Sequence, residues 1–249
     1  MVNELKENFV FTMEGHIHYK YYKNINQNSN PKNLIFLHGL GASSTAWKRV
    51  ADMFPDKYNL YFLDILGHGQ SDAPIIKYNV ETQAKMLGEF IKALHLSNTY
   101  IIGHSYGSWV ALYYASSSKN IINGLVIVDA VGLDIYFKNI TPLERIKSID
   151  KMFYQIMKID GNKDYVIKSI LNSEYNKEWL TEEILAKITV PTLIIWGEMD
   201  KIIDPKYAEI FNKRIKNSKV KILKGAGHTP HYTNTKEFID ILSNFIDEN

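Results

Sequence analysis

The sequence predicts an α/β protein built around a mostly parallel β-sheet. Short β-type runs alternate with stretches of helical spacing along most of the 249 residues. Several of the β-type runs are almost continuously apolar, as expected for parallel strands that helices cover on both faces. Hydrophobic residues make up 45% of the chain and charged residues 22%, which is typical of a globular protein and excludes a disordered one.

The chain opens with two runs that predict a hairpin. "NFVFTME" and "HIHYKYY" flank Gly15, and their alternation suits a half-buried antiparallel pair. His16 and His18 share one face of the second run, but two histidines without a third ligand are more often surface residues than a metal site. Further strands are expected at residues 33–39, 58–65, 99–105, 124–131, 191–197 and 220–225, which makes eight in all.

Helices are expected between these strands, at residues 45–54, 81–96 and 109–117. Residues 132–187 break the alternation, because they contain no convincing strand. Thr141 is placed to cap a helix, with Pro142 at its first position and Glu144 completing a capping box. Residues 163–172 and 181–188 also have helical patterns. This insertion predicts a helical cap after the sixth strand, with residues 1–131 and 188–249 forming the core.

The predicted cap is rich in aromatic and methionine side chains. They could line an apolar pocket, or they could only pack the cap helices together, and the sequence leaves both alternatives open. The residues concerned are Tyr136, Phe137, Met152, Phe153, Tyr154, Met157, Tyr165, Tyr175 and Trp179.

Composition and charge exclude several classes of function. The formal net charge is +2, with Lys and Arg scattered, so there is no electrostatic reason to expect a nucleic acid or an anionic membrane as partner. The absence of cysteine excludes disulfides, thiolate catalysis and Cys-ligated zinc. The N-terminus lacks the apolar stretch of a signal peptide, and no run approaches the roughly 18–20 residues of a membrane span. We therefore expect a cytoplasmic protein; the sequence does not indicate its oligomeric state.

Ser105 lies in the pattern G-x-S-x-G, between Gly103 and Gly107, after a predicted strand and before a predicted helix. On such a sharp turn the serine backbone is strained, and a side chain at either glycine would crowd the neighbouring strand or helix. The turn raises the serine hydroxyl above the strand ends, at the N-terminus of the helix. This placement predicts a nucleophile.

A serine hydroxyl needs a base, usually histidine, and that histidine needs a carboxylate to fix its tautomer. His228, in "KGAGHTPHY" after the last predicted strand, is the expected base, and His231 is its rival. Asp200, three residues after the glycine that ends the preceding strand, is the expected acid. Asp129, at the end of the strand before the cap, is the second choice for the acid, and Asp204 and Glu198 lie near Asp200 in the sequence.

An acyl-transfer site also needs hydrogen-bond donors for the oxyanion. The backbone N–H of Tyr106 follows the nucleophile directly. The second donor is expected from the loop "FLHGLGASSTAW", at the N–H of Leu40. We expect His38 to have a structural role, holding this loop through its ring nitrogens.

Taken together, these motifs resemble those of the α/β-hydrolase superfamily, in its capped, carboxylesterase-like branch. The matching stretches are "HGLG" at 38–41, "DILGHGQSD" at 64–72, "GHSYG" at 103–107, "GEMD" at 197–200 and "GHTP" at 227–230. The resemblance implies the α/β-hydrolase fold, with Ser105 as nucleophile, His228 as base and Asp200 as acid. It also implies an oxyanion hole at Leu40 and Tyr106, and a loop at residues 64–72 that shapes the sheet edge without catalysing.

The sequence departs from the family pattern at a few positions. Ser108 stands where many relatives have a further glycine, and Thr233 and Thr235 stand where a glutamate and a proline are common. A serine nucleophile, in place of aspartate, argues against haloalkane dehalogenase and epoxide hydrolase chemistry.

The expected function is hydrolysis of small-molecule carboxylic esters through an acyl-enzyme on Ser105, with no metal or organic cofactor. The size of the predicted cap favours short to medium acyl groups. Several alternatives stay open at this point: hydrolysis of a C–C bond, lactone or amide, acyl transfer or perhydrolysis, and a ligand receptor that keeps the triad without turnover.

Overall fold

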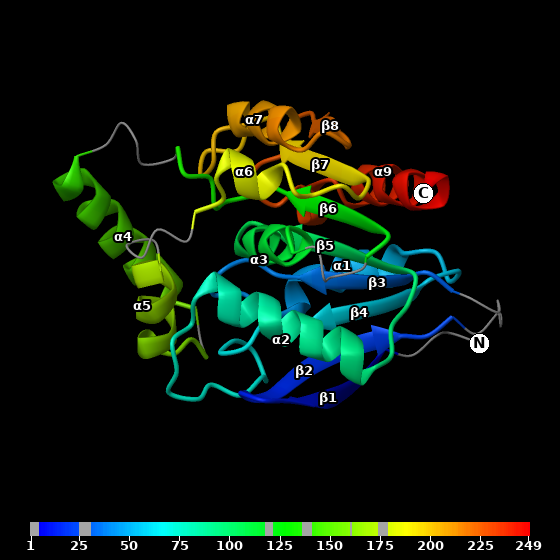
Figure 1. Cartoon of the computed structure of the whole chain (residues 1–249), viewed down its shortest axis with the longest axis horizontal. Helices are drawn as coiled ribbons and strands as arrows, with labels where there is room; N and C mark the ends of the chain where they lie inside the picture. The colour runs from blue at the N-terminus through cyan, green and yellow to red at the C-terminus, as the bar shows by residue number, and fades with distance from the viewer. Residues whose placement is uncertain (1–4, 25–30, 118–121, 136–140, 160, 174–178) are drawn as a thin grey trace.

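The computed structural model describes residues 5–24, 31–117, 122–135, 141–159, 161–173 and 179–249. It confirms the α/β fold with an eight-stranded, mostly parallel sheet, whose strands follow the spatial order β1-β2-β4-β3-β5-β6-β7-β8 (Figure 1). The strands are β1 (Lys6–Thr12), β2 (Gly15–Tyr22), β3 (Asn33–Leu37), β4 (Asn59–Leu63), β5 (Thr99–His104), β6 (Gly124–Val128), β7 (Thr192–Gly197) and β8 (Ser218–Leu223).

The N-terminal hairpin supplies the antiparallel part of the sheet, because β2 pairs antiparallel with both β1 and β4. From β4 across to β8 all pairings are parallel. Every residue of β3, β5, β6 and β7 is buried, which explains their continuous apolar sequences. Because these strands are parallel, their carboxyl ends share one edge of the sheet, and this is the edge where ligands bind in open α/β sheets.

Helices cover both faces of this sheet (Figure 1). The helices are α1 (Lys48–Met53), α2 (Val80–Ala93), α3 (Tyr106–Ala115), α4 (Pro142–Ile156), α5 (Asp164–Ser173), α6 (Glu182–Leu185), α7 (Lys206–Arg214), α8 (Pro230–Thr233) and α9 (Thr235–Glu248). Helices α1 to α6 agree with the predicted helical stretches, except that residues 44–47 form a 3₁₀ turn and the helix after Ser105 starts earlier than expected, at Tyr106. Helices α7, α8 and α9 lie outside those stretches.

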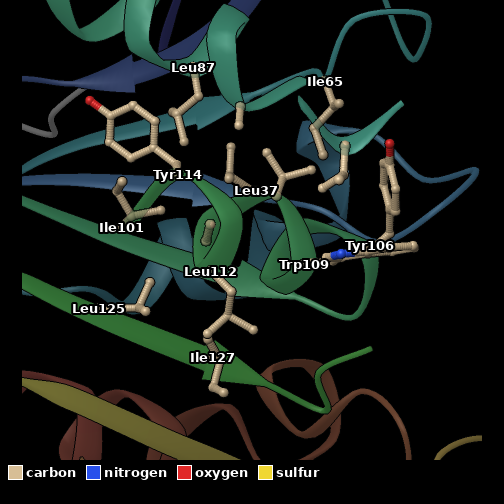
Figure 2. Close-up of a cluster of buried hydrophobic side chains, with 14 of the residues drawn as sticks. Leu37, Ile65, Leu87, Ile101, Tyr106, Trp109, Leu112, Tyr114, Leu125 and Ile127 are labelled. Carbon is tan, nitrogen blue, oxygen red and sulfur yellow. The ribbon is translucent and has the colours of Figure 1, made fainter. Parts of the chain in front are cut away.

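The two faces of the sheet carry separate hydrophobic cores. On one face α2, α3 and α7 pack over inward side chains such as Leu37, Ile101 and Ile127. Figure 2 shows part of this core, with Leu112 of α3 directed at the strands and Trp109 and Tyr106 near its edge. On the other face α1 and α9 pack over the alternate residues of the same strands. Burial on both faces holds the carboxyl ends of the strands in fixed positions.

Between β6 and β7 the chain forms α4, α5 and α6, called here the α4–α6 segment. The predicted capping box is confirmed: Thr141 Oγ1 accepts a hydrogen bond from the Glu144 N–H, and the Glu144 carboxylate accepts one from the Thr141 N–H. No strand forms in the described parts of this segment, apart from a single bridge between Leu133 and Leu180. In Figure 1, α4 and α5 lie to the left, beyond the carboxyl ends of the parallel strands.

The expectation that both hairpin histidines are surface residues is wrong for His18. Its ring is fully buried, and Nδ1 lies 2.8 Å from Asp64 Oδ2. His16 is partly exposed and bonds to Asp72, with 2.7 Å between Nδ1 and Oδ2. Sequence alternation places both on one side of β2, but Asp64, at the end of β4, is brought there by the tertiary fold. None of the described helices is long and apolar enough to cross a membrane.

Candidate active site

Ser105 sits on a strained turn between β5 and α3. Its backbone angles are φ 50° and ψ −113°, a region that non-glycine residues rarely occupy. A Cβ at Gly103 would overlap the backbone of Gly107 and Ser108, and one at Gly107 would overlap the carbonyl of Leu37 in β3. The predicted need for both glycines is therefore confirmed, since helix and strands approach too closely here for side chains.

Ser108 fills the position where many relatives have glycine, and its side chain ties three elements together. Ser108 Oγ donates to the Gly103 carbonyl at 2.6 Å and accepts from the Val128 N–H at 3.1 Å. The Ser105 N–H in turn donates to the Val128 carbonyl at 2.8 Å. The turn that carries Ser105 is thus anchored to β6 as well as to its own strand.

His228 and Asp200 are joined across two loops at the same edge of the sheet. His228 Nδ1 lies 2.7 Å from Asp200 Oδ2. Asp200 Oδ1 accepts from the N–H groups of Ile202 and Ile203 at 2.8 and 3.0 Å, so backbone donors fix the orientation of the carboxylate. The Asp200 side chain is fully buried, whereas that of His228 keeps 15% of its surface exposed. Nε2 is left as the ring nitrogen that can exchange a proton.

Among the described residues, Ser105 Oγ has no hydrogen-bond partner, and its bond to His228 is not formed. In unliganded enzymes such a bond is commonly long and shortens once the substrate is bound. Both side chains line one cavity, together with Leu40 and Tyr106. The structure therefore brings together all five residues that the sequence singled out.

The rival acids have other partners. Asp129 is fully buried and accepts from the Gly197 N–H through Oδ1 at 2.9 Å. Burial, together with the nearby charge of Asp200, raises its pKa to about 8, although the bond from Gly197 opposes the shift. Asp204 bonds to Lys206, and Glu198 accepts from the Gly225 N–H. Among these four carboxylates, only that of Asp200 is hydrogen-bonded to the His228 ring.

Two further imidazoles lie beside His228. The His104 ring is 5.0 Å from the His228 ring and 4.6 Å from the His231 ring, measured between centroids. His104 Nε2 donates to the His228 carbonyl at 2.7 Å and so helps to place the loop that bears His228. Burial lowers the pKa of His231 to about 3 and that of His104 well below its usual value, so both rings are neutral. A buried, neutral His231 packed against Trp47, with 4.3 Å between ring centroids, is poorly placed to be the base.

The loop after β3 forms a hydrogen-bonded turn over residues 39–42. The Ala42 N–H donates to the Gly39 carbonyl at 3.1 Å, and Gly41 has φ +74°, as the third residue of a type II turn requires. His38 Nδ1 donates to the same Gly39 carbonyl at 2.7 Å, while its Nε2 accepts from the Ile65 N–H at 3.0 Å. The expected structural role of His38 is therefore confirmed. Within the described residues, the Leu40 N–H donates no hydrogen bond of its own.

The cavity at this edge has a volume of about 610 Å³ and lies between the core and the α4–α6 segment. That volume is within the range of about 300–1,000 Å³ typical of small-molecule sites. Its walls are mostly apolar, and Ser105 and His228 are among its polar lining residues. The apolar wall includes Leu40, Trp109, Val131, Met152, Ile156, Ile170, Leu171, Trp179, Ile202 and Ile203.

The two expectations for the aromatic and methionine residues of the segment are each right for some residues. Met152 and Trp179 line the cavity, and the Trp179 ring stacks on Trp109 with 5.3 Å between centroids. Phe153 and Met157 instead pack among the helices, and Tyr154 is exposed. Tyr165 donates to the Ala73 carbonyl. Tyr136, Phe137 and Tyr175 lie outside the described residues.

Sequence reasoning missed two residues at this site. Trp109 reads as part of an apolar helix, and Asn162, in "DGNK", reads only as a turn residue. In the structure Asn162 Nδ2 donates to the carbonyl of Gly41 at 3.0 Å. Neither residue has a local pattern that would have revealed its contact with the cavity or the loop.

His104, Asp129 and His228 each offer one possible metal-ligand atom, and these atoms lie within 4.8 Å of one another. Both histidines already use one ring nitrogen in a bond to protein. The three residues belong to the hydrogen-bonded site described above, and we propose no metal site there.

Comparison with known proteins agrees with this geometry. The family model of the alpha/beta hydrolase fold matches residues 32–164 and 148–235. The chain belongs to this family. Among the relatives of this α/β-hydrolase, Lipase 3 of Moraxella sp. (strain TA144) is 27% identical over 82% of this chain and 74% of its own length. Monoacylglycerol lipase ABHD6 of Mus musculus is 27% identical over 79% of this chain and 70% of its own length.

Solved structures agree on the fold of this α/β-hydrolase. The esterase EaEST from Exiguobacterium antarcticum superposes with a TM-score of 0.81 at 21% identity, over 96% of this chain and 99% of the other. At that identity the likeness speaks for the fold alone. The lipases among the sequence relatives support ester hydrolysis as an activity at the level of the family.

Proposed function

We propose that this α/β-hydrolase is a serine carboxylesterase that forms an acyl-enzyme on Ser105. The observation that carries the proposal is the bond between His228 Nδ1 and the buried Asp200 Oδ2, at 2.7 Å, in the same cavity as Ser105. A histidine held in this way presents Nε2 as a base. A serine on a strained turn at the start of a helix offers its hydroxyl to that base.

In the proposed mechanism, His228 Nε2 takes the proton of the Ser105 hydroxyl as Oγ attacks the ester carbonyl carbon. The negative charge that develops on the carbonyl oxygen is stabilised by the backbone N–H groups of Leu40 and Tyr106. Asp200 stays ionised and stabilises the imidazolium of His228. The tetrahedral intermediate then expels the alcohol, which takes its proton from Nε2.

Deacylation follows the same route with water. His228 Nε2 removes a proton from the water, whose oxygen attacks the acyl carbonyl, and the carboxylic acid leaves as Ser105 Oγ regains a proton from Nε2. The neutral rings of His104 and His231 supply no proton to this cycle at neutral pH, because burial lowers the pKa of both. No step calls on a cofactor.

The apolar walls of the cavity support an ester with an aliphatic acyl or alkyl group as the substrate class. The α4–α6 segment would act as a cap that closes the cavity from above and keeps the chain short to medium in length. On this proposal residues 132–187 form the cap, and residues 1–131 and 188–249 form the catalytic core.

The test is hydrolysis of a p-nitrophenyl ester series from acetate to palmitate, with the Ser105→Ala variant as control. We expect many turnovers per enzyme, a rate maximum at short or medium chains, and loss of about 10⁴–10⁶-fold in kcat for the variant. Release of a single equivalent of p-nitrophenol, or equal rates for both proteins, would contradict the proposal and favour a ligand receptor on this fold.

A further inference from the structure

Asn162 joins the α4–α6 segment to the loop that carries Leu40. Its side-chain Nδ2 donates to the Gly41 carbonyl at 3.0 Å and to the Ile156 carbonyl at 3.1 Å. Ile156 is the last residue of α4, and its carbonyl also accepts from the Ile159 N–H at 3.0 Å. One amide group thus holds the end of α4 and the turn after β3 together.

The contact between α4 and this turn is also close in steric terms. A Cβ at Gly41 would lie 2.5 Å from Ile156 Cγ2 and 3.2 Å from Asn162 Nδ2. Gly41 has φ +74°, so a side chain there would be strained as well as crowded. The turn therefore packs closely against α4, and the hydrogen bond from Asn162 links the two.

The position of the turn matters because the Leu40 N–H is part of it. The orientation of this N–H follows from the plane of the Gly39–Leu40 peptide, to which it belongs. The Gly39 carbonyl, which belongs to the same peptide as the Leu40 N–H, is held from the core by His38 and by the Ala42 N–H. The Gly41 carbonyl shares its peptide with that Ala42 N–H, and Asn162, between α4 and α5, holds this peptide through the carbonyl. Asn162 is therefore connected to the Leu40 N–H through the hydrogen bond from Ala42 to Gly39.

We infer that Asn162 is a positioning residue for the reaction: from the α4–α6 segment, it fixes the turn that presents the Leu40 N–H to the oxyanion. The inference rests on the proposed function, because it assigns a role within the same site. Asn162 does not touch the reacting atoms. We expect Asn162 to affect mainly the stabilisation of the transition state, because the oxyanion needs a donor at a fixed place. Its effect on the affinity for the neutral ester should be small.

The experiment compares Asn162→Ala with Asn172→Ala, an asparagine-to-alanine change at an exposed position of α5. Active sites are counted by titration with a p-nitrophenyl alkylphosphonate, so that kcat refers to folded, competent enzyme. For Asn162→Ala we expect kcat to fall about tenfold with KM within twofold of the wild type, since one donor is displaced but not deleted. Asn172→Ala is expected to match the wild type.

A second measurement separates positioning from a merely structural role. An alkyl trifluoromethyl ketone adds to Ser105 and forms an oxyanion, whereas the corresponding alkyl alcohol only fills the cavity. The inhibition constant of the ketone should rise about tenfold in Asn162→Ala, and that of the alcohol should stay unchanged. Asn162→Asp should be more impaired than Asn162→Ala, because a carboxylate would face two carbonyl oxygens.

Equal kcat and equal ketone affinity in Asn162→Ala and the wild type would overturn the inference, even if the variant unfolds at a lower temperature. Failure of the proposed function has a different signature. In that case the wild type itself shows neither repeated turnover nor inhibition by the ketone, and Ser105→Ala is no less active than the wild type.

Discussion

At the scale of single residues, the two buried aspartates beside His228 have opposite roles. Asp200 receives two backbone N–H groups and the His228 ring, all of which stabilise a carboxylate. Asp129 receives one N–H through Oδ1, and its Oδ2 has no hydrogen-bond partner. The same region of the fold therefore holds one aspartate with both oxygens hydrogen-bonded and another with one unpaired oxygen and a raised pKa.

The raised pKa of Asp129 makes stability depend on pH. Its folded-state pKa of about 8 lies above the ordinary value of 3.8. Between about pH 4 and about pH 8, therefore, the folded protein keeps a proton on Asp129 that the unfolded chain has lost. Its contribution to stability is complete below about pH 4 and is lost as the pH rises towards 8. We expect Asp129→Asn to remove this loss. As the pH rises, the free energy of unfolding of the variant should therefore increase relative to that of the wild type by up to about 1.4 kcal/mol per pH unit.

Urea unfolding at pH 5, 6, 7 and 8 measures this difference in the free energy of unfolding. The matched control is Asp240→Asn on the exposed face of α9. A gap between Asp129→Asn and the wild type that does not change with pH would show that Asp129 is charged in the folded protein.

At the scale of elements, the strained turn after β5 depends on how β5, α3 and β6 are joined. Ser108 is the residue that joins them, and its side chain is fully buried. A glycine at this position, as in many relatives, could not make these bonds. The departure from the family pattern therefore adds a link that holds the Ser105 turn against β6.

We expect Ser108→Ala to lower the free energy of unfolding by about 1–3 kcal/mol, because the buried Val128 N–H loses its acceptor. The turn itself keeps its two glycines, so kcat should stay within about threefold of the wild type. Thermal unfolding and ester hydrolysis of the same preparations test both parts, with the exposed Ser117→Ala as control. Unchanged stability would mean that water replaces the hydroxyl at no cost.

The stacked pair Trp109 and Trp179 forms a wall between α3 and the α4–α6 segment. Truncation of Trp179 would lengthen the cavity at this wall. For Trp179→Ala we expect the ratio of kcat/KM for the octanoate ester to kcat/KM for the butyrate ester to rise about tenfold. This size is expected because a hydrophobic pocket discriminates between chain lengths by roughly 1–3 kcal/mol. The control is Tyr154→Ala, an exposed aromatic of α4. An unchanged ratio would place the acyl chain in another part of the cavity.

At the scale of the whole molecule, Asp64 connects segments that are far apart in the chain. Its carboxylate binds the His18 ring of the hairpin and accepts from the Ser44 N–H at 2.5 Å and the Gln70 N–H at 2.9 Å. Burial opposes ionisation of this group, but these hydrogen bonds outweigh it and hold its pKa below the ordinary value. Asp64 thereby links the N-terminal hairpin to the sheet edge on which the cavity opens.

Because its folded-state pKa is lowered, the stabilisation by Asp64 is present above the ordinary value of 3.8 and is lost as the pH falls below it. We expect Asp64→Asn to lose about 3–5 kcal/mol of unfolding free energy at pH 7, and the difference from the wild type to shrink below pH 4. Urea unfolding at pH 7 and pH 3.5 measures both values. Asp52→Asn, which breaks only the exposed ion pair with Lys48, should cost less than about 1 kcal/mol. A similar loss in both variants would contradict the special role of Asp64.

Much of this architecture could be predicted from the sequence. Continuous apolar runs separated by helices indicate a parallel sheet, and residues directly after such strands must meet at one edge. That reasoning brings Ser105, Asp200 and His228 to the same place, since each follows a strand of the parallel part. The need for glycine at 103 and 107 follows from the sharp turn alone. Local rules suffice in these cases because the periodicity and turn chemistry that they use are properties of short segments.

Only the tertiary structure decided which groups pair. Asp129 and Asp200 follow neighbouring strands, and in the fold the Asp200 carboxylate bonds to the His228 ring whereas that of Asp129 accepts from the Gly197 N–H. Other contacts also join segments that are far apart in the chain. The bond between His18 and Asp64 spans 46 residues, and that between Asn162 and Gly41 spans 121. The stacking of Trp109 on Trp179 likewise joins α3 to the α4–α6 segment. Such contacts depend on how helices and loops pack across the sheet. Packing is set by the shapes of all the facing side chains together, and no single stretch of sequence contains that information.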